Sequence, residues 1–434
     1  CSKNSFFSRR ISISVGNNQK KEKPRLVILG SGWGGFRFLR DIDRSAFDVK
    51  VISPRNHFLF TPLLASTCVG TLNFRSIIEP IRAEKDSRFY QATVNDIDFK
   101  NRLVECEGSL NAKTFQVKYD HLLIAVGAKN NNFGIPGVKE HCHYLKELNH
   151  ARAIRTKIIE SFELANLPSL DAKERKRLLT FVIVGGGPTG SEFAAELNDF
   201  FWQDLSRLYP NVPMNEVRII LLEATDRILS MFERSLVTQA MKQFKRGGIE
   251  VRTSAIVTSV SDQGVTLDSG EFIPSGTVIW TAGIAPVPLI DKLELEHQNG
   301  RLVVDDHLRV IDDKVEENSI FALGDCALIK DNVLQPTAQV AQQQGVYLAK
   351  TLNTFSKTKK LPEKPFSFHF LGFMAYVGNY SSLLDTPQAK GSGLVAWLAW
   401  RSIYLTKLGS FRNKCRVPFD WLWTFLFGRD VSSF

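Results

Sequence analysis

The chain has 434 residues, of which 44% are hydrophobic and 23% are charged, and a globular chain of this length forms about two or three domains. Its net charge is +10, yet residues 24–389 carry 42 basic and 42 acidic residues, so the excess lies at the two ends. This balanced body argues against a nucleic-acid-binding face on the fold, and no apolar run in the sequence is long enough for a membrane-spanning helix.

The first 21 residues are basic and rich in serine, with five Lys or Arg and no acidic residue. This composition resembles what remains of a mitochondrial transit peptide, and a flexible basic arm is the alternative interpretation. Neither interpretation gives residues 1–23 a place in the core.

The first predicted strand, Arg25–Leu29, leads directly into a glycine-rich motif and then into a helical stretch. The order strand, GxGxxG, helix is typical of a dinucleotide-binding unit. The glycines allow a tight turn, close approach of the backbone to a pyrophosphate and close packing of helix on strand, while the helix N-terminus attracts phosphate. The cofactor contacts predicted here are Gly30, Ser31, Gly32, Trp33, Gly34 and Gly35.

The next predicted strand, Asp48–Ile52, departs from this pattern at its end. An acidic residue is expected there to bind the adenosine ribose, but the chain has Ser53, Pro54 and Arg55. A serine hydroxyl still bonds a ribose hydroxyl and an arginine approaches a phosphate, so these three residues are also predicted to contact the cofactor.

A second copy of the motif follows the predicted strand Phe181–Val184 and opens a second helix. Further along, the strand Val217–Leu222 ends in Glu223, which is an acid placed to accept bonds from the ribose of NADH and to repel the 2′-phosphate of NADPH. Arg227 weakens that preference, and a solvated strand end is the alternative interpretation of Glu223. The nucleotide contacts predicted here are Gly185, Gly187, Pro188, Thr189, Gly190, Glu192 and Glu223.

Three further strings are predicted as buried strands that end in small residues. The strings 119–127 and 277–283 end at Gly127 and at Ala282-Gly283, and they are placed where the chain crosses between two nucleotide domains beneath the cofactor. Gly127 is therefore predicted to contact the cofactor of the first unit, and Ala282 and Gly283 the nucleotide of the second. The string 319–325 ends in Gly324-Asp325, where a carboxylate accepts a hydrogen bond from a ribitol hydroxyl.

The six cysteines form no CxxC or CxxxxC pair, so no redox dithiol and no zinc site is predicted. The run His141-Cys142-His143 lacks a second ligand pair. We therefore interpret it as a loop and predict no metal.

The order of these elements resembles the two-dinucleotide-binding-domain flavoproteins. The strings 53–64, 185–197 and 336–344 resemble those of the mitochondrial type II, or alternative, NADH:quinone oxidoreductases. The resemblance implies non-covalently bound FAD, with Thr61 and Ala338 among its contacts, NADH as substrate and a ubiquinone-type quinone as acceptor. It implies that Gln339 and Gln343, four apart on one helix face, line the quinone site, with Gln339 also near the flavin, and that Glu192 lies near the nicotinamide. Without this resemblance, a glutamine-rich helix is usually one that presents a solvated face. Glu192 would then only cap or solvate the helix start, where the helix dipole favours an acid.

The C-terminal region is aromatic and basic. The stretches 393–408 and 417–427 contain four of the seven tryptophans, which is typical of helices that lie in a bilayer interface. A dimer interface or a lid over the core is the alternative, and the resemblance implies both dimerisation and docking on the mitochondrial inner membrane, with the matrix side favoured.

The fold prediction is therefore an α/β protein with two Rossmann-like domains and a C-terminal membrane-associating helical segment. The FAD domain is assigned to residues 24–147 and 286–355, the NADH domain to residues 148–285, and the C-terminal region to residues 356–434. An FAD- and NAD-binding redox sensor or scaffold of the apoptosis-inducing type is the alternative function.

Overall fold

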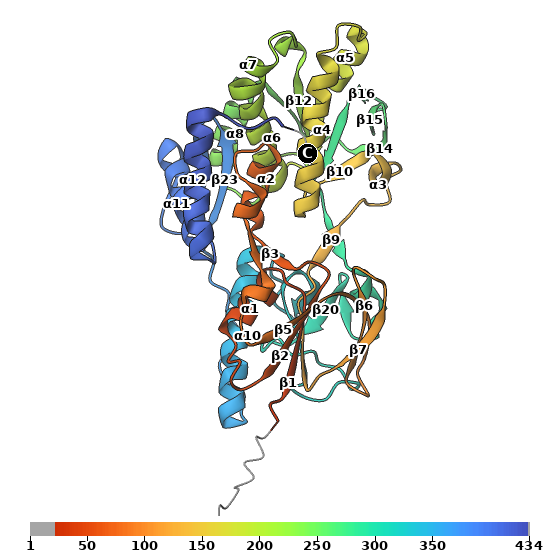
Figure 1. Ribbon diagram of the computed structural model, residues 1–434, viewed down its shortest axis with the longest axis vertical. Helices are drawn as coiled ribbons and strands as arrows, with labels where there is room; N and C mark the ends of the chain where they lie inside the picture. The colour runs from red at the N-terminus through yellow and green to blue at the C-terminus, as the bar shows by residue number, and fades with distance from the viewer. Residues whose placement is uncertain (1–21, 433–434) are drawn as a thin grey trace, which may run out of the picture.

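The computed structural model describes residues 22–432 and has two lobes stacked along its long axis (Figure 1). The basic segment expected to be a targeting remnant lies almost wholly outside the described residues. The first lobe is built on a seven-stranded sheet in the order β21-β8-β1-β2-β5-β6-β7. Its strands are β1 (Arg25–Leu29), β2 (Asp48–Ser53), β5 (Ser87–Asp98), β6 (Leu103–Gly108), β7 (Thr114–Lys118), β8 (His121–Ile124) and β21 (Ile320–Ala322).

The five strands from β21 to β5 are parallel. Leu26 to Leu29 in β1 are all 0% exposed, because a parallel sheet is covered on both faces and favours continuous apolar runs. Helices α1 (Trp33–Asp41) and α10 (Ala338–Thr358) pack against each other beside this sheet. A Cβ on Gly345 of α10 would lie 2.6 Å from the carbonyl oxygen of Gly34 in α1, so this close packing requires glycine.

The second lobe is built on a five-stranded parallel sheet in the order β10-β17-β11-β12-β13. Its main helices are α4 (Leu148–Ala165), α6 (Pro188–Phe200) and α8 (Arg234–Gly247), and α6 continues through a π-helical turn, η4 (Phe201–Leu205), into α7 (Ser206–Leu208). The strands are β10 (Cys142–Tyr144), β11 (Thr180–Val184), β12 (Arg218–Leu222), β13 (Ile249–Arg252) and β17 (Thr277–Trp280).

Two details of the sequence-based organisation need correction. The chain joins the second sheet at β10, a few residues before the boundary predicted at residue 148. The run His141-Cys142-His143, predicted as a loop, is not one. Cys142 and His143 pair with β17, and His141 ends the short helix α3 (Val138–His141).

Two antiparallel strands, β9 (Ala128–Asn130) and β18 (Ile284–Pro286), carry the chain between the lobes. They follow Gly127 and Gly283, the ends of the two predicted crossing strings. The remaining small elements are β3 (His57–Leu59), η1 (Thr61–Leu63), α2 (Leu64–Cys68), η2 (Phe74–Ser76), β4 (Ile78–Pro80), η3 (Ile81–Ala83), α5 (Ala172–Leu178), η5 (Met214–Glu216), β14 (Val257–Ser261), β15 (Gly264–Leu267), β16 (Phe272–Pro274), α9 (Pro288–Lys292), β19 (His297–Gln298), β20 (Arg301–Val304), η6 (Gly324–Cys326) and β22 (Ala327–Ile329).

The C-terminal unit lies along the lobe that contains α6 and α8 (Figure 1). It contains a small antiparallel sheet, β23 (Phe373–Gly378), β24 (Ser381–Asp385) and β25 (Lys390–Gly393), which the sequence did not predict, and two helices, α11 (Leu394–Lys407) and α12 (Phe411–Phe427). Trp400 and Trp421 from these helices are buried in the main core. Within residues 22–432, no helix combines the length and apolar character needed to cross a membrane.

Candidate active site

A cavity of 690 Å³ lies where the two lobes meet, and both contribute to its wall. This is within the usual range for small-molecule sites, which is roughly 300–1,000 Å³. From the first lobe the predicted residues that line it are Gly30, Ser31, Gly32, Trp33, Gly34, Ser53, Pro54, Arg55, Thr61, Gly127, Gly324, Asp325 and Ala338. From the second lobe they are Thr189, Glu192 and Gly283.

The first glycine loop has the geometry of a phosphate cradle. Gly30 has a φ of +104°, and a Cβ there would lie 2.2 Å from the carbonyl oxygen of Ala125. Gly35 does not line the cavity, because it packs against Gly30, whose carbonyl oxygen would lie 2.3 Å from its Cβ. At Gly32, in contrast, a Cβ would meet no protein atom within 4 Å. Gly32 also caps α1 without a side-chain hydrogen bond, so the first amides of that helix are available to a ligand anion.

A polar network surrounds the end of β2, where the acid expected to bind the adenosine ribose is missing. The hydroxyls of Ser31 and Ser53 are hydrogen-bonded to each other at 2.9 Å. Arg55 donates from Nη1 to Glu147 Oε2 at 2.5 Å, and Glu147 also lines the cavity. Sequence reasoning missed Glu147, because it is 92 residues from Arg55 and no local motif marks it. It brings a carboxylate to the part of the cavity where the strand β2 supplies none.

The Gly324-Asp325 turn is held from α10. Gln344 is buried and accepts a hydrogen bond from the Gly324 amide at 2.8 Å, a role that the sequence did not reveal. Burial raises the pKa of Asp325, and the charges of Lys146 and Arg301 oppose this shift. Among the described residues, none donates a hydrogen bond to the Asp325 carboxylate, which faces the cavity. A half-buried acceptor of this kind fits a ligand hydroxyl, so the lining as a whole fits FAD.

The second glycine loop repeats the geometry of the first. A Cβ on Gly190 would lie 2.0 Å from the carbonyl oxygen of Gly185, and Gly187 is open to space like Gly32. Glu223 lies beside this loop and accepts hydrogen bonds from the amides of Gly186 and Thr225, at 2.7 and 2.8 Å. The carboxylate is therefore placed at the nucleotide loop, although its hydrogen bonds in this structure go to the protein. Gly185, Gly187, Pro188, Gly190, Glu223 and Ala282 lie outside the wall of the large cavity.

Glu192, near the start of α6, is 8% exposed and faces the large cavity. Its carboxylate accepts a hydrogen bond from the backbone amide of Tyr376 at 3.1 Å. Burial raises the pKa of Glu192 to about 8. The hydrogen bond from Tyr376 lowers this pKa, whereas the negative charge of Glu196 raises it further. The group therefore gains or loses a proton near neutral pH, which suits a role in proton transfer.

Gln339 and Gln343 each make two hydrogen bonds to backbone groups. Gln339 donates to the carbonyl of Gly372 at 2.7 Å and accepts from the amide of Leu371, while Gln343 makes the same pair of bonds to His369. Neither side chain lines the large cavity. The amides thus hold the backbone segment 369–372, just before β23, instead of pointing freely at a ligand. This segment contains Phe370 and Leu371, which are 44% and 51% exposed.

Two glycine cradles, each following a parallel strand of its own sheet, and a cavity where the two lobes meet define a flavin- and nicotinamide-dependent reductase with two dinucleotide-binding domains. The family model described as pyridine nucleotide-disulphide oxidoreductase matches residues 24–345. A second model, described as NDH2 C-terminal domain, matches residues 370–430. The chain belongs to this family and, within it, to the type II NADH dehydrogenases. It lacks the closely spaced cysteine pair that a disulphide reductase uses.

Similar proteins span nearly the whole chain. A probable NADH dehydrogenase of Dictyostelium discoideum is 51% identical, with 95% of this chain and 92% of the relative covered. The internal alternative NAD(P)H-ubiquinone oxidoreductase A1, mitochondrial, of Solanum tuberosum is 40% identical, with 97% and 90% covered. The solved structure of NDH2 from Plasmodium falciparum in complex with NADH superposes with a TM-score of 0.90 at 28% identity, with 95% of this chain and 100% of that chain covered.

Proposed function

We propose that this protein oxidises NADH and passes the electrons through bound FAD to a ubiquinone-type quinone, without pumping protons. The observation that carries this proposal is the single cavity that the flavin-type cradle shares with Thr189, Glu192 and Gly283 of the nucleotide lobe. The relatives named as NAD(P)H-ubiquinone oxidoreductases support the choice of quinone as acceptor.

FAD supplies the redox chemistry, because its ring system accepts a hydride and gives up electrons to a quinone. The chain's own residues bind and orient. The Gly30–Gly35 loop and the start of α1 would hold the pyrophosphate, and Asp325 would accept a hydrogen bond from a ribitol hydroxyl. Glu147 takes the place of the missing strand-end acid near Arg55. On the nucleotide side, the Gly185–Gly190 loop holds NADH, and Glu223 favours it over NADPH.

Glu192 is assigned to the junction of nucleotide, flavin and quinone. Its position on the cavity wall allows it to orient the nicotinamide or to supply a proton to the quinone. Gln339 and Gln343 are assigned to the quinone site, and their observed hydrogen bonds allow them to act through the backbone that they hold. They position the segment 369–372, whose exposed apolar side chains we assign to the quinone entrance.

The C-terminal helices are assigned to docking on the mitochondrial inner membrane as a peripheral protein. These helices carry the exposed apolar residues Leu394, Val395, Leu398, Phe411, Phe419, Leu422, Trp423, Phe425, Leu426 and Phe427. The cations Arg412, Lys414 and Arg416 on α12 are exposed as well. Exposed apolar side chains flanked by basic side chains bind the surface of an anionic bilayer. The targeting segment at residues 1–23, a position on the matrix side and homodimerisation through the C-terminal region complete the proposal.

The test follows the flavin absorbance of the purified protein. NADH should abolish the absorbance in the absence of oxygen, and a soluble quinone should restore it, with NADPH much less effective than NADH. A redox sensor or scaffold would lose its absorbance with NADH but would not recover it with quinone. That outcome would favour the alternative function.

A further inference from the structure

A second cavity, of 630 Å³, lies between the far end of α6 and the helices of the C-terminal unit. Residues from α6, η4, α7, β23, α11, α12 and the segment after α12 form its wall, together with Thr71 and Tyr380, and none of them lines the flavin cavity. The wall residues that matter here are Glu196, Asp199, Asp204, Tyr376, Arg401 and Arg429.

Carboxylate side chains are spaced along helix α6 between the two cavities. Glu192, Glu196 and Asp199 are spaced at i, i+4 and i+7, which places them on one helix face. They are only 8%, 5% and 5% exposed. Glu192 lines the flavin cavity, whereas Glu196 and Asp199 line the second cavity. The face spans about 10 Å along the helix axis, with one turn between successive acids.

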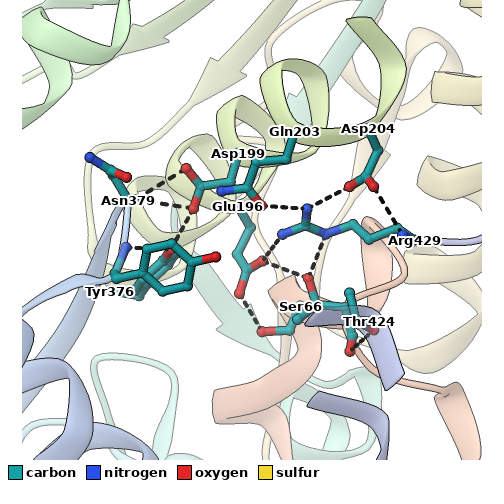
Figure 2. Close-up of polar contacts among 11 residues, drawn as sticks. Ser66, Glu196, Asp199, Gln203, Asp204, Tyr376, Asn379, Thr424 and Arg429 are labelled. Carbon is teal, nitrogen blue, oxygen red and sulfur yellow. Dashed lines mark hydrogen bonds and ion pairs between the residues drawn. The ribbon is translucent and has the colours of Figure 1, made fainter. Parts of the chain in front are cut away.

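Arg429 balances part of this buried negative charge, as Figure 2 shows. Its side chain is 7% exposed and lies 2.7 Å from Asp204 and 3.9 Å from Glu196. The hydroxyls of Ser66 and Thr71 donate to the two oxygens of Glu196, at 2.6 and 2.9 Å. Asp204 and Glu196 are therefore paired with a cation, which lowers the cost of burying them.

Asp199 differs from these two, because no arginine bonds it directly. It accepts a hydrogen bond from the Tyr376 hydroxyl and another from the Asn379 amide at 3.1 Å. Burial raises the pKa of Asp199 to about 6, against the hydrogen bond from Tyr376. Tyr376 thus contacts two acids that titrate near neutral pH, since its hydroxyl bonds Asp199 and its backbone amide bonds Glu192.

Quinone reduction requires a proton supply at a buried site. The reaction NADH + H⁺ + quinone → NAD⁺ + quinol moves two electrons and one proton as hydride from NADH and takes a second proton from water. We propose that this second proton enters through the second cavity and passes along the acid face of α6, from Asp199 by way of Glu196 to Glu192. This proposal rests on the function proposed above and adds the route by which the proton arrives.

The spacing of the acids fits such a route. Neighbouring acids on the face are one turn apart, about 5–6 Å between Cβ atoms, which is a gap that one water molecule bridges. Tyr376 is a positioning residue, because its hydroxyl fixes the Asp199 carboxylate. The charged and titratable groups that face the three acids from the packed elements are Cys68 of α2, Asp204 of η4, Tyr376 of β23, Arg401 and Tyr404 of α11, and Arg429.

The test is Asp199→Asn, which keeps the shape and the acceptor for Tyr376 but cannot release a proton. The rate at which NADH removes the flavin absorbance should stay near that of wild type. Recovery of the absorbance with quinone should slow by on the order of 10- to 100-fold, and its solvent deuterium isotope effect should rise. Asp199→Glu should restore both. Tyr376→Phe should give a smaller change of the same kind.

Asp204→Asn is the matched control, because Asp204 lies on the same cavity wall but off the acid face. It should lower thermal stability and leave the isotope effect unchanged. An unchanged quinone rate and isotope effect in both Asp199→Asn and Tyr376→Phe would refute the route. So would equal losses in both half-reactions, which indicate a structural role. Failure of wild-type protein to recover its absorbance with quinone would instead overturn the proposed function.

Discussion

The backbone amide of Tyr376 in β23 donates a hydrogen bond of 3.1 Å to the carboxylate of Glu192 in α6. The C-terminal unit therefore reaches the wall of the flavin cavity, and it is not simply a membrane anchor attached to a complete enzyme. The C-terminal unit therefore supports the active site, and this role is separate from the docking on lipid that we propose for it.

We expect the triple substitution Phe411→Ser, Phe419→Ser and Trp423→Ser to abolish binding to anionic vesicles and to leave the fold intact. The three side chains are 83%, 60% and 55% exposed, so the core loses little. Vesicle sedimentation and circular dichroism measure the two properties. As a control, Leu110, Phe272 and Val333, which are 86%, 47% and 60% exposed outside the C-terminal unit, are changed to Ser. Vesicle binding that survives the first triple would place the lipid contact elsewhere.

Truncation before Gly391 should behave differently from the triple variant. It removes Trp400, Leu408, Val417 and Trp421 from the core, and deleting even one large buried side chain costs about 3–5 kcal/mol. We expect a large fall in the thermal midpoint and loss of FAD. A truncated protein that kept its flavin and its stability would show that the segment serves only as an anchor.

Gly32→Val should give a folded protein without flavin. A Cβ at Gly32 meets no protein atom within 4 Å, so the added side chain occupies only the space of the pyrophosphate. Gly30→Val is the matched comparison and should not fold, because its Cβ would lie 2.2 Å from the Ala125 carbonyl oxygen. Visible absorbance and circular dichroism distinguish the two results. A yellow Gly32→Val protein would place the pyrophosphate away from this loop.

Glu223→Gln should raise activity with NADPH relative to NADH. The single carbonyl oxygen of Gln can still accept the hydrogen bond from Gly186, whereas the bonds from Thr225 to the second carboxylate oxygen are lost; the repulsion of a 2′-phosphate disappears with the charge. A tenfold change in the ratio of kcat/KM values would correspond to about 1.4 kcal/mol. The measurement is steady-state oxidation of both nucleotides, and an unchanged ratio would assign the discrimination to another residue.

Replacing both Gln339 and Gln343 with Leu should slow the quinone half-reaction by about ten- to a hundredfold and spare the NADH half-reaction. The expected cause is release of the segment 369–372, since four hydrogen bonds are lost. Each net hydrogen bond contributes roughly 0.5–1.5 kcal/mol, so the variant should also be less stable. Stopped-flow absorbance separates the half-reactions. Impaired NADH oxidation with normal quinone reduction would mean that this helix borders the nicotinamide.

Stability should depend on pH through Glu192. Its pKa rises from 4.5 to about 8 on folding, so between these values the folded protein holds a proton that the unfolded chain has released. The free energy of unfolding of wild type therefore falls as the pH rises through this window. Glu192→Gln has no proton to release, so its free energy of unfolding should not fall in this way. Its stability relative to wild type should therefore increase as the pH rises from about 5 to about 9. Parallel urea curves at all pH values would show that Glu192 is not buried as described.

Local patterns predicted the parts of the structure that depend on neighbours in the sequence. The loops Gly30–Gly35 and Gly185–Gly190 follow buried strands and open helices, so the fold class and the cradles could be read from the chain. The contacts that complete the site are long-range. Arg55 meets Glu147, and Arg429 meets Asp204 across 225 residues. Such pairs leave no periodic signal, and the roles of the two α10 glutamines depend on a segment that the sequence did not mark.

The first sheet combines strands from distant parts of the chain, so its strands are synthesised at different times. All strands of the NADH-binding sheet come from residues 142–280, whereas β8 acquires its neighbour β21 only when residues 320–322 have been made. A chain that emerges N-terminus first, at about 5–20 residues per second, can complete the nucleotide lobe while the flavin lobe still has an open sheet edge. Helix α10, which packs on α1, arrives later still. The wall of the flavin cavity is complete only once Gly324, Asp325 and Ala338 have been made, and a nascent chain stalled before β21 would leave one edge of β8 unpaired and exposed to aggregation.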